Sequence, residues 1–141
     1  MISIIREEPR ERFRILLIDD DRDFGKLFLS HASYSGIDAD YYDSLSATGS
    51  VGCLKNYDAI ILDINLEKMT GFEIAEYVQA FFGDKPVILI SSDDLDLRVI
   101  LPACIKAFIP KKNGMDDLIQ EINAYSFTRE AGASEVGLWE R

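Results

Sequence analysis

The chain has 141 residues, which is enough for one domain with its own hydrophobic core. Its composition, 48% hydrophobic and 28% charged, excludes a disordered or fibrous protein. The net charge of −10 argues against direct binding to nucleic acid, which needs a basic surface. No apolar run is long enough to cross a bilayer, and the charged stretch 6–14 is unlike a signal peptide. We therefore expect a cytoplasmic protein that does not contact membranes.

Short apolar runs then alternate with amphipathic stretches, a pattern typical of βα units around a parallel sheet. Residues 13–18 predict a buried first strand that stops at three consecutive aspartates. Apolar residues at helical spacing over 24–32 predict a helix that ends near Gly36. Residues 37–42 alternate apolar and polar positions, which predicts a second strand with one face partly open.

The middle of the chain repeats this alternation with one weak member. Residues 44–55 predict a helix, but Gly49 and Gly52 dilute its pattern. Residues 59–62 predict the third strand, which ends at an aspartate. The spacing of apolar residues over 74–82 then predicts the third helix.

The last part of the chain predicts two more strands and two more helices. Residues 87–90 form an apolar run that predicts the fourth strand, and a short helix over 94–101 should stop at Pro102. Residues 105–109 predict the fifth strand. An apolar stripe over 115–122 predicts the final helix.

Five strands and five helices in strict alternation predict an α/β fold: a doubly wound parallel sheet with helices on both faces, in three layers. In the flavodoxin-like form of this fold the strand order is 2-1-3-4-5, and ligands bind at the carboxyl ends of the strands. We expect the domain to span residues 13–126, with an N-terminal extension over 1–12 and a C-terminal tail or linker over 127–141.

Polar residues follow the predicted strands at those carboxyl ends. They are Asp19, Asp20 and Asp21 after the first strand, Asp63 after the third, Ser91 after the fourth and Lys111 after the fifth. Because the first and third strands are neighbours in this order, their carboxylates should converge and repel one another. A bound cation relieves that repulsion, and ligands that are all oxygen favour Mg²⁺. The lysine and the hydroxyl would complete a site for a phosphoryl group.

Four segments carry a resemblance to a known family. In order they are Ile15–Asp21 (ILLIDDD), Tyr57–Leu66 (YDAIILDINL) with Gly71 beyond it, Pro86–Ser91 (PVILIS) and Ala107–Lys111 (AFIPK). Together, in this order and at this spacing, they resemble the motif blocks of response-regulator receiver domains, across residues 13–125. Each block alone is a weak signal; the four together are a strong one.

The resemblance implies that Asp63 accepts a phosphoryl group as an acyl phosphate. The donor would be a phosphohistidine on a sensor histidine kinase or on a histidine phosphotransfer protein. Mg²⁺ would be held by Asp63, by Asp20 directly, by Asp19 largely through water, and by the backbone carbonyl of Asn65. Such a domain is a signalling switch that phosphorylates and dephosphorylates itself, not an enzyme with turnover.

The same resemblance implies how the switch is transmitted to a downstream protein partner or effector domain. Lys111 would pair with the phosphoryl oxygens, and Ser91 would move in to hydrogen-bond them. Phe108 occupies the aromatic switch position and would turn inward as Ser91 moves. Asn65 and Asp93 flank the expected path of a water, so we expect a short-lived acyl phosphate.

Several positions depart from the family pattern. Lys112 replaces the proline that commonly follows the lysine, and a cis bond there would cost about 3 kcal/mol without proline. Pro110 lies within the fifth strand, which is tolerated because this strand is a sheet edge. Glu67 replaces a proline that is common in the loop after the acceptor, and Pro102 shortens the fourth helix.

Two other functions stay open. A receiver-like interaction module that is never phosphorylated would typically lack one of the pocket residues, and here all of them are present. A phosphatase similar to haloacid dehalogenases would use the Asp-x-Asp that Asp19 and Asp21 form, but this leaves Asp63 unexplained. Asp21 and Asp23 are each better interpreted as residues that cap the first helix.

Overall fold

The computed structural model describes residues 13–66, 69–83, 85–93 and 101–134. Five strands form one parallel sheet in the order β2-β1-β3-β4-β5. The strands are β1 (Arg14–Ile18), β2 (Asp38–Tyr42), β3 (Ala59–Asp63), β4 (Val87–Ser91) and β5 (Ile105–Pro110). The predicted strand order is therefore confirmed, and each strand lies within a residue or two of its expected position.

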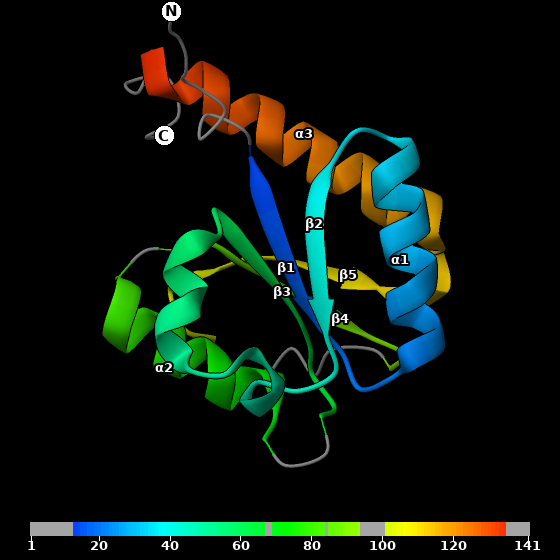
Figure 1. The fold of residues 1–141 in the computed structure, drawn as a ribbon. Coiled ribbons are helices and arrows are strands. Elements are labelled where there is room, and N and C mark those ends of the chain that lie inside the picture. Colours follow the sequence, from blue (N-terminus) through cyan, green and yellow to red (C-terminus); the bar gives the residue numbers. More distant parts are fainter. Residues whose placement is uncertain (1–12, 67–68, 84, 94–100, 135–141) are drawn as a thin grey trace, which may run out of the picture.

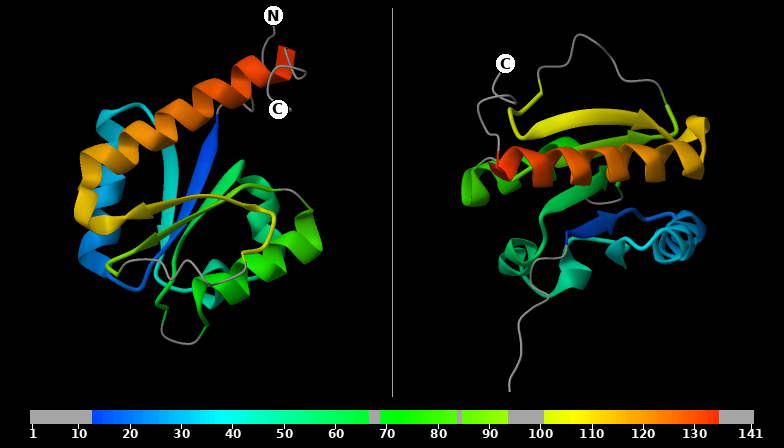
Figure 2. Two further views of the ribbon diagram at one scale, coloured as in Figure 1. Left: turned by 180° about the vertical axis from the view of Figure 1, so that it is seen from behind. Right: turned by 90° about the horizontal axis from the view of Figure 1, so that it is seen from above.

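Helices cover both faces of this sheet (Figures 1 and 2). The α-helices are α1 (Arg22–Tyr34), α2 (Gly71–Phe82) and α3 (Met115–Ser134). Because successive strand residues point to opposite faces, β1 supplies two separate cores. Ile15 and Leu17 pack with α1 and α3, whereas Leu16 and Ile18 pack with α2. All four side chains are fully buried, which anchors the end of β1 from both faces.

Local capping sets where two of the helices begin. Asp21 is the N-cap of α1, and its side chain accepts a hydrogen bond from the backbone N–H of Phe24, as expected. Thr70 and Glu73 form a reciprocal capping box at the start of α2. These caps let α1 begin shortly after β1, and α2 begin at the end of the loop that follows β3.

The expectation of five helices is wrong for the described residues, which contain three α-helices. Over 44–55 the structure has two 3₁₀ helices, Ser46–Thr48 and Val51–Asn56, instead of one α-helix. Gly49 separates them with φ of +94°, a conformation that a continuous right-handed helix excludes. The helix expected over 94–101 falls almost entirely on residues 94–100, which lie outside the described residues.

The final helix is longer than its apolar stripe predicts. Residues Met115 to Ile122 pack on the sheet, but α3 continues to Ser134. The helix therefore crosses the boundary that we expected at residue 126, and the division into domain and tail stays a prediction. Among the described residues, no helix is both long and apolar enough to span a membrane.

Candidate functional site

The carboxyl ends of the strands bring the predicted polar residues to one edge of the sheet. Asp63 is the last residue of β3 and Ser91 the last of β4, while Asp19 and Lys111 directly follow β1 and β5. Asp19, Asp63 and Ser91 are buried at 0%, 5% and 2% exposure, although all three are polar. Buried polar groups without partners are costly, so their contacts indicate what the site is built to hold.

Lys111 connects the two buried carboxylates. Its Nζ lies 2.7 Å from Asp19 Oδ2 and 3.1 Å from Asp63 Oδ2. The same ammonium lies 4.4 Å from the centre of the Phe24 ring on α1. Burial lowers the pKa of Lys111, but the contacts with Asp19 and Asp63 outweigh it and raise that pKa overall. The raised pKa favours the charged ammonium, which lies between the carboxylates at the ends of β1 and β3.

Asp19 has one carboxylate oxygen that is well satisfied and one that is not. Oδ1 accepts a hydrogen bond of 2.9 Å from the backbone N–H of Asp21. Oδ2 is buried and faces Lys111, but among the described residues no donor meets it with hydrogen-bond geometry. The pKa of Asp19 is raised to about 7, mainly by burial and also by the charge of Asp63, against the opposing effects of Lys111 and the Asp21 N–H.

The three carboxylates at this edge fit a divalent cation. One oxygen from each of Asp19, Asp20 and Asp63 lies within 4.8 Å of the other two. Lys111 contacts two of these carboxylates, Asp19 and Asp63, and Asp20 is exposed beside them. An oxygen-only set of this kind suits a hard cation such as Mg²⁺ better than zinc or copper.

The loop after Asp63 is hydrogen-bonded to the Asp63 side chain. The backbone N–H of Asn65 donates to Asp63 Oδ1 over 3.1 Å, so both oxygens of this carboxylate have a partner. Gly71 packs against the Asp63 carbonyl so closely that a Cβ at residue 71 would lie 2.5 Å from it. Asn65 itself is exposed, and the metal-binding role expected of its backbone carbonyl stays a prediction.

Ser91 and Phe108 lie on neighbouring strands. Ser91 Oγ accepts a hydrogen bond of 3.1 Å from the N–H of Asp93, which leaves the hydroxyl proton available to donate. Phe108 pairs in register with Leu89, two residues before Ser91, so these three residues share one face of the sheet. Phe108 is half-buried against the α2 core.

The loop after Lys111 adopts ordinary backbone geometry despite the missing proline. Lys111–Asn113 form a single 3₁₀ turn, and the described residues contain no cis peptide bond. Pro110 ends β5, which is an edge strand as expected. With Lys112 in the place of the proline, Lys111 Nζ still contacts both Asp19 and Asp63.

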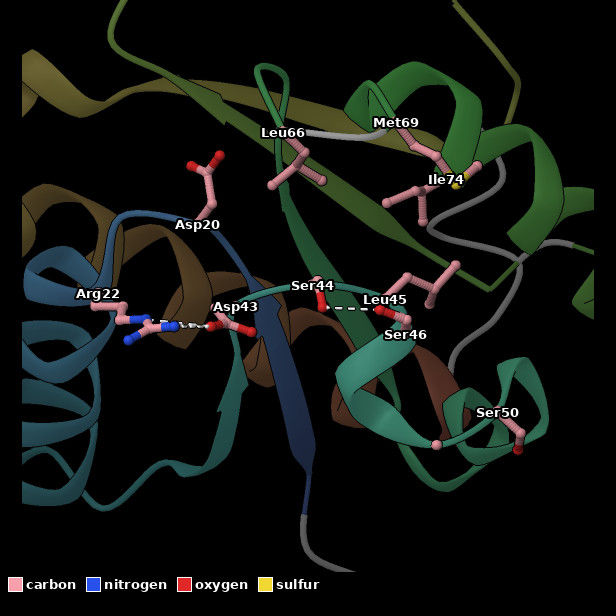
Figure 3. Close-up of a pocket in the computed structure, with 11 residues that line it drawn as sticks. Asp20, Arg22, Asp43, Ser44, Leu45, Ser46, Ser50, Leu66, Met69 and Ile74 are labelled. Atoms are coloured by element: carbon pink, nitrogen blue, oxygen red, sulfur yellow. Dashed lines mark hydrogen bonds and ion pairs between the residues drawn. The ribbon is translucent and has the colours of Figure 1, made fainter.

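A cavity of about 620 Å³ opens beside Asp20 (Figure 3). One side is apolar, formed by Leu45, Leu66, Met69 and Ile74. On the other side Arg22 forms an ion pair of 3.0 Å with Asp43, and the Asp20 carboxylate points away from this pair. The cavity is bordered by Ser46 of the first 3₁₀ helix and by Gly49 and Ser50 after it, so it lies in the segment where we expected the second helix.

The sequence did not reveal three residues that support the site. The hydroxyl of Tyr41 donates a hydrogen bond of 2.7 Å to the backbone carbonyl of Asp19. Gly25 lies against the Tyr41 ring, and Phe24 lies beneath Lys111. In the sequence, Tyr41 was one member of an alternating strand and Phe24 one member of an apolar stripe. No local signal distinguishes either residue from an ordinary core position.

Sequence comparisons identify relatives for most of the chain. A family model described as "Response regulator receiver domain" matches residues 15–123. The transcriptional regulatory protein RprY of Bacteroides fragilis is 32% identical over 117 residues, which cover 81% of this chain and 49% of that protein. Response regulator MprA of Mycobacterium avium is 25% identical over 114 residues, covering 79% and 50%. The chain thus spans about half the length of these curated relatives.

Solved structures share the fold. The receiver domain of the Francisella response regulator 1452 superposes with a TM-score of 0.73 at 21% identity, covering 84% of this chain and 99% of that one. Response regulator TrrA of Thermotoga maritima, solved in complex with Mg²⁺ and BeF, gives 0.70 at 21% identity, covering 79% and 97%. With the match over residues 15–123, this chain belongs to the response regulator receiver domain family.

Proposed function

We propose that this receiver domain accepts a phosphoryl group on Asp63 in a reaction that requires Mg²⁺. The observation that carries the proposal is the position of Asp63 Oδ2, which lies 3.1 Å from Lys111 Nζ and beside two further carboxylates. A carboxylate between a fixed cation and a cation site is suited to attack a phosphoryl group, because the positive groups offset the charge of its oxygens. The structure of TrrA with Mg²⁺ and BeF supports a site of this kind in a relative.

The residues divide the chemistry between them. Asp63 attacks the phosphorus of a phosphohistidine, a P–O bond forms, the P–N bond breaks, and its electron pair returns to the imidazole. Asp19, Asp20, Asp63 and the Asn65 carbonyl would hold Mg²⁺. The metal supplies positive charge to the phosphoryl oxygens. Lys111 pairs with the same oxygens from the β5 side. The donor is a sensor histidine kinase or a histidine phosphotransfer protein.

Ser91 on β4 and Phe108 on β5 transmit the phosphorylation state of Asp63 to a partner. Once a phosphoryl group is present on Asp63, the Ser91 hydroxyl donates a hydrogen bond to it. Phe108 lies on the same face of the sheet, one strand further out, and turns inward as Ser91 moves. A downstream protein partner or effector domain distinguishes the two arrangements. The acyl phosphate is short-lived, because Asn65 and Asp93 offer polar groups that orient an attacking water.

The geometry gives little support to a phosphatase similar to haloacid dehalogenases. That reaction needs the second aspartate of Asp19-x-Asp21 as an acid or base. Here the Asp21 side chain accepts a hydrogen bond from the Phe24 N–H and caps α1. The alternative of a module that is never phosphorylated keeps the same fold, and the following experiment separates it from the proposal.

The test is phosphorylation by acetyl phosphate with Mg²⁺, measured as the mass of the intact protein. We expect the gain of one phosphoryl group, which decays over minutes to hours and is absent when a chelator replaces Mg²⁺. Asp63→Asn should show no gain, because the amide is not a nucleophile. Asp58→Asn is a matched control, since Asp58 lies next to the other end of β3.

Three outcomes contradict the proposal or a part of it. A gain that persists in Asp63→Asn would place the acceptor elsewhere. No gain with acetyl phosphate or with a phosphorylated histidine phosphotransfer protein would favour the phosphorylation-independent module. A phosphoprotein that lasts for many hours would refute the short lifetime while leaving the acceptor residue in place.

A further inference from the structure

The backbone of Asp19 is held by strand β2 after β1 has ended. The Asp19 N–H donates to the carbonyl of Tyr42 over 3.2 Å, which extends the ladder by one bond. The Asp19 carbonyl accepts the hydroxyl of Tyr41 at 2.7 Å. That second bond comes from a side chain, because the strand pairing of β1 with β2 stops at Ile18 and Tyr42.

The Tyr41 hydroxyl therefore controls more than one residue. The Asp19 carbonyl belongs to the planar peptide group that connects Asp19 to Asp20. A bond that fixes the direction of this carbonyl also fixes where the Cα of Asp20 lies. Since Asp19 Oδ1 is held by the Asp21 N–H, the turn holds one carboxylate directly and orients the next one through the peptide plane.

Gly25 on α1 makes room for this tyrosine. A Cβ on Gly25 would lie 2.3 Å from Cζ of Tyr41 and 2.5 Å from both Cε atoms, well inside contact distance. Gly25 is buried in the helix interior, where glycine costs roughly 1 kcal/mol relative to alanine. Its backbone does not have positive φ, so the helix itself does not need glycine there. What glycine provides is space for the Tyr41 ring.

We infer that Tyr41, seated against Gly25, is a positioning residue for the metal carboxylates Asp19 and Asp20. This inference rests on the proposed Mg²⁺ site. Mg²⁺ requires near-octahedral geometry with short bonds, so small rotations of a ligand weaken binding. Groups that orient metal ligands typically contribute about 10- to 100-fold to metal affinity. Tyr41 acts through the backbone of Asp19 and does not touch the phosphoryl group.

The first test is the Mg²⁺ affinity of Tyr41→Phe, measured by titration calorimetry on the full chain. We expect Mg²⁺ to bind about tenfold more weakly, with a rate of phosphorylation at saturating Mg²⁺ close to that of wild type. Tyr57→Phe is the matched control, because Tyr57 also donates its hydroxyl to a protein oxygen, Asp40 Oδ2 at 2.6 Å, away from the pocket. It should lower the melting temperature and leave the Mg²⁺ affinity unchanged.

A second variant tests whether the space at Gly25 positions the Tyr41 ring. Gly25→Ala should displace the Tyr41 ring and weaken Mg²⁺ binding in the same direction. In a Tyr41→Phe background, Gly25→Ala should cause little further loss of affinity, because the hydroxyl bond is already gone. Additive losses of Mg²⁺ affinity in the double variant would contradict a shared mechanism.

The outcomes separate the two proposals. If wild type binds Mg²⁺ and Tyr41→Phe binds it equally well, the inference is wrong and the proposed function stands. A lower melting temperature with unchanged Mg²⁺ affinity would assign Tyr41 a structural role only. If wild type binds no Mg²⁺, the proposed function and the inference both fail.

Discussion

Two acidic clusters in this molecule have the same ingredients and differ in what they leave unsatisfied. The pocket cluster lies at the carboxyl ends of the strands and consists of Asp19, Asp20, Asp63, Lys111 and Phe24. The basal cluster lies near the amino ends of β1 and β3 and consists of Arg14, Asp38, Asp40, Tyr57 and Asp58. In each, one cation contacts two aspartates and lies over an aromatic ring, at 4.4 Å for Lys111 and 4.9 Å for Arg14.

Burial and hydrogen-bond donors distinguish the clusters. In the basal cluster Asp40 Oδ2 accepts from both Arg14 and the Tyr57 hydroxyl, and its side chain is 43% exposed. In the pocket cluster Asp19 is fully buried, and its Oδ2 forms an ion pair of 2.7 Å with Lys111 but, within the described residues, has no donor that meets hydrogen-bond geometry. In this molecule the carboxylates that fit a cation are therefore buried around one ammonium, whereas the basal carboxylates are partly exposed and have more donors.

The comparison is tested most strongly by removing each cation. Lys111→Gln leaves Asp19 and Asp63 buried without their partner. With a chelator present to remove Mg²⁺, we expect the substitution to lower the free energy of unfolding by about 3 kcal/mol. Arg14→Gln should cost less than about 1 kcal/mol, because its partners are partly exposed. Urea unfolding of both variants checks this. Equal losses would mean that the two clusters are energetically alike.

Neutralising one carboxylate in each cluster should change the free energy of unfolding in opposite directions. The raised pKa of Asp19 means that its charge, at pH 8, is less stable in the folded protein than in the unfolded chain. Asp19→Asn should then stabilise the chelated protein by about 1 kcal/mol. Asp40→Asn loses an ion pair and should destabilise by about 1 kcal/mol. Thermal unfolding at pH 8 measures both, and a destabilised Asp19→Asn would contradict the unfavourable burial of the Asp19 charge.

The aromatic ring beneath Lys111 should make a smaller contribution. Phe24→Leu keeps an apolar side chain and removes the cation–π contact, and we expect the coupling energy with Lys111→Gln to be about 1 kcal/mol. A double-mutant cycle by urea unfolding measures it. The pair Phe24→Leu and Arg14→Gln is the control and should show no coupling, since Arg14 lies over Tyr57.

The smallest effect concerns alkaline pH at the basal cluster. Burial raises the pKa of Tyr57, and the Asp40 carboxylate that accepts its hydroxyl raises it further. When folding raises the pKa of a tyrosine, the protonated hydroxyl stabilises the folded protein. This contribution is fully present below the pKa of the unfolded chain, about 10, and is lost as the pH rises through the pKa of the folded protein. Stability should fall above about pH 10, and less steeply in Tyr57→Phe. Identical profiles would exclude this contribution.

Much of the fold was predictable because its signals are local. The apolar runs after Phe13, Tyr57 and Pro86 predicted three strands, and helical spacing predicted α1 and α2. The prediction of one α-helix over 44–55 was wrong because a residue pattern does not show which backbone conformation a glycine such as Gly49 will adopt. The length of α3 was missed because residues after Ile122 have no apolar stripe.

The candidate site divides in the same way. Strand ends and motif blocks placed Asp19, Asp20, Asp63, Ser91 and Lys111 at one edge, because parallel strands bring their carboxyl ends together. Tyr41 and Gly25 were not predictable, because they are 16 residues apart on different elements and meet only once α1 packs on β2.

The sequence alone determined the alternation of strands and helices, the family resemblance and the residues that gather at the carboxyl edge. These follow from patterns within short segments, which burial and backbone geometry impose locally. Only the tertiary structure decided which carboxylate oxygen lacks a donor, which ring lies beneath Lys111 and which hydroxyl holds the Asp19 carbonyl. Those properties depend on distances between side chains from separate elements, and they exist only after the sheet and its helices have packed.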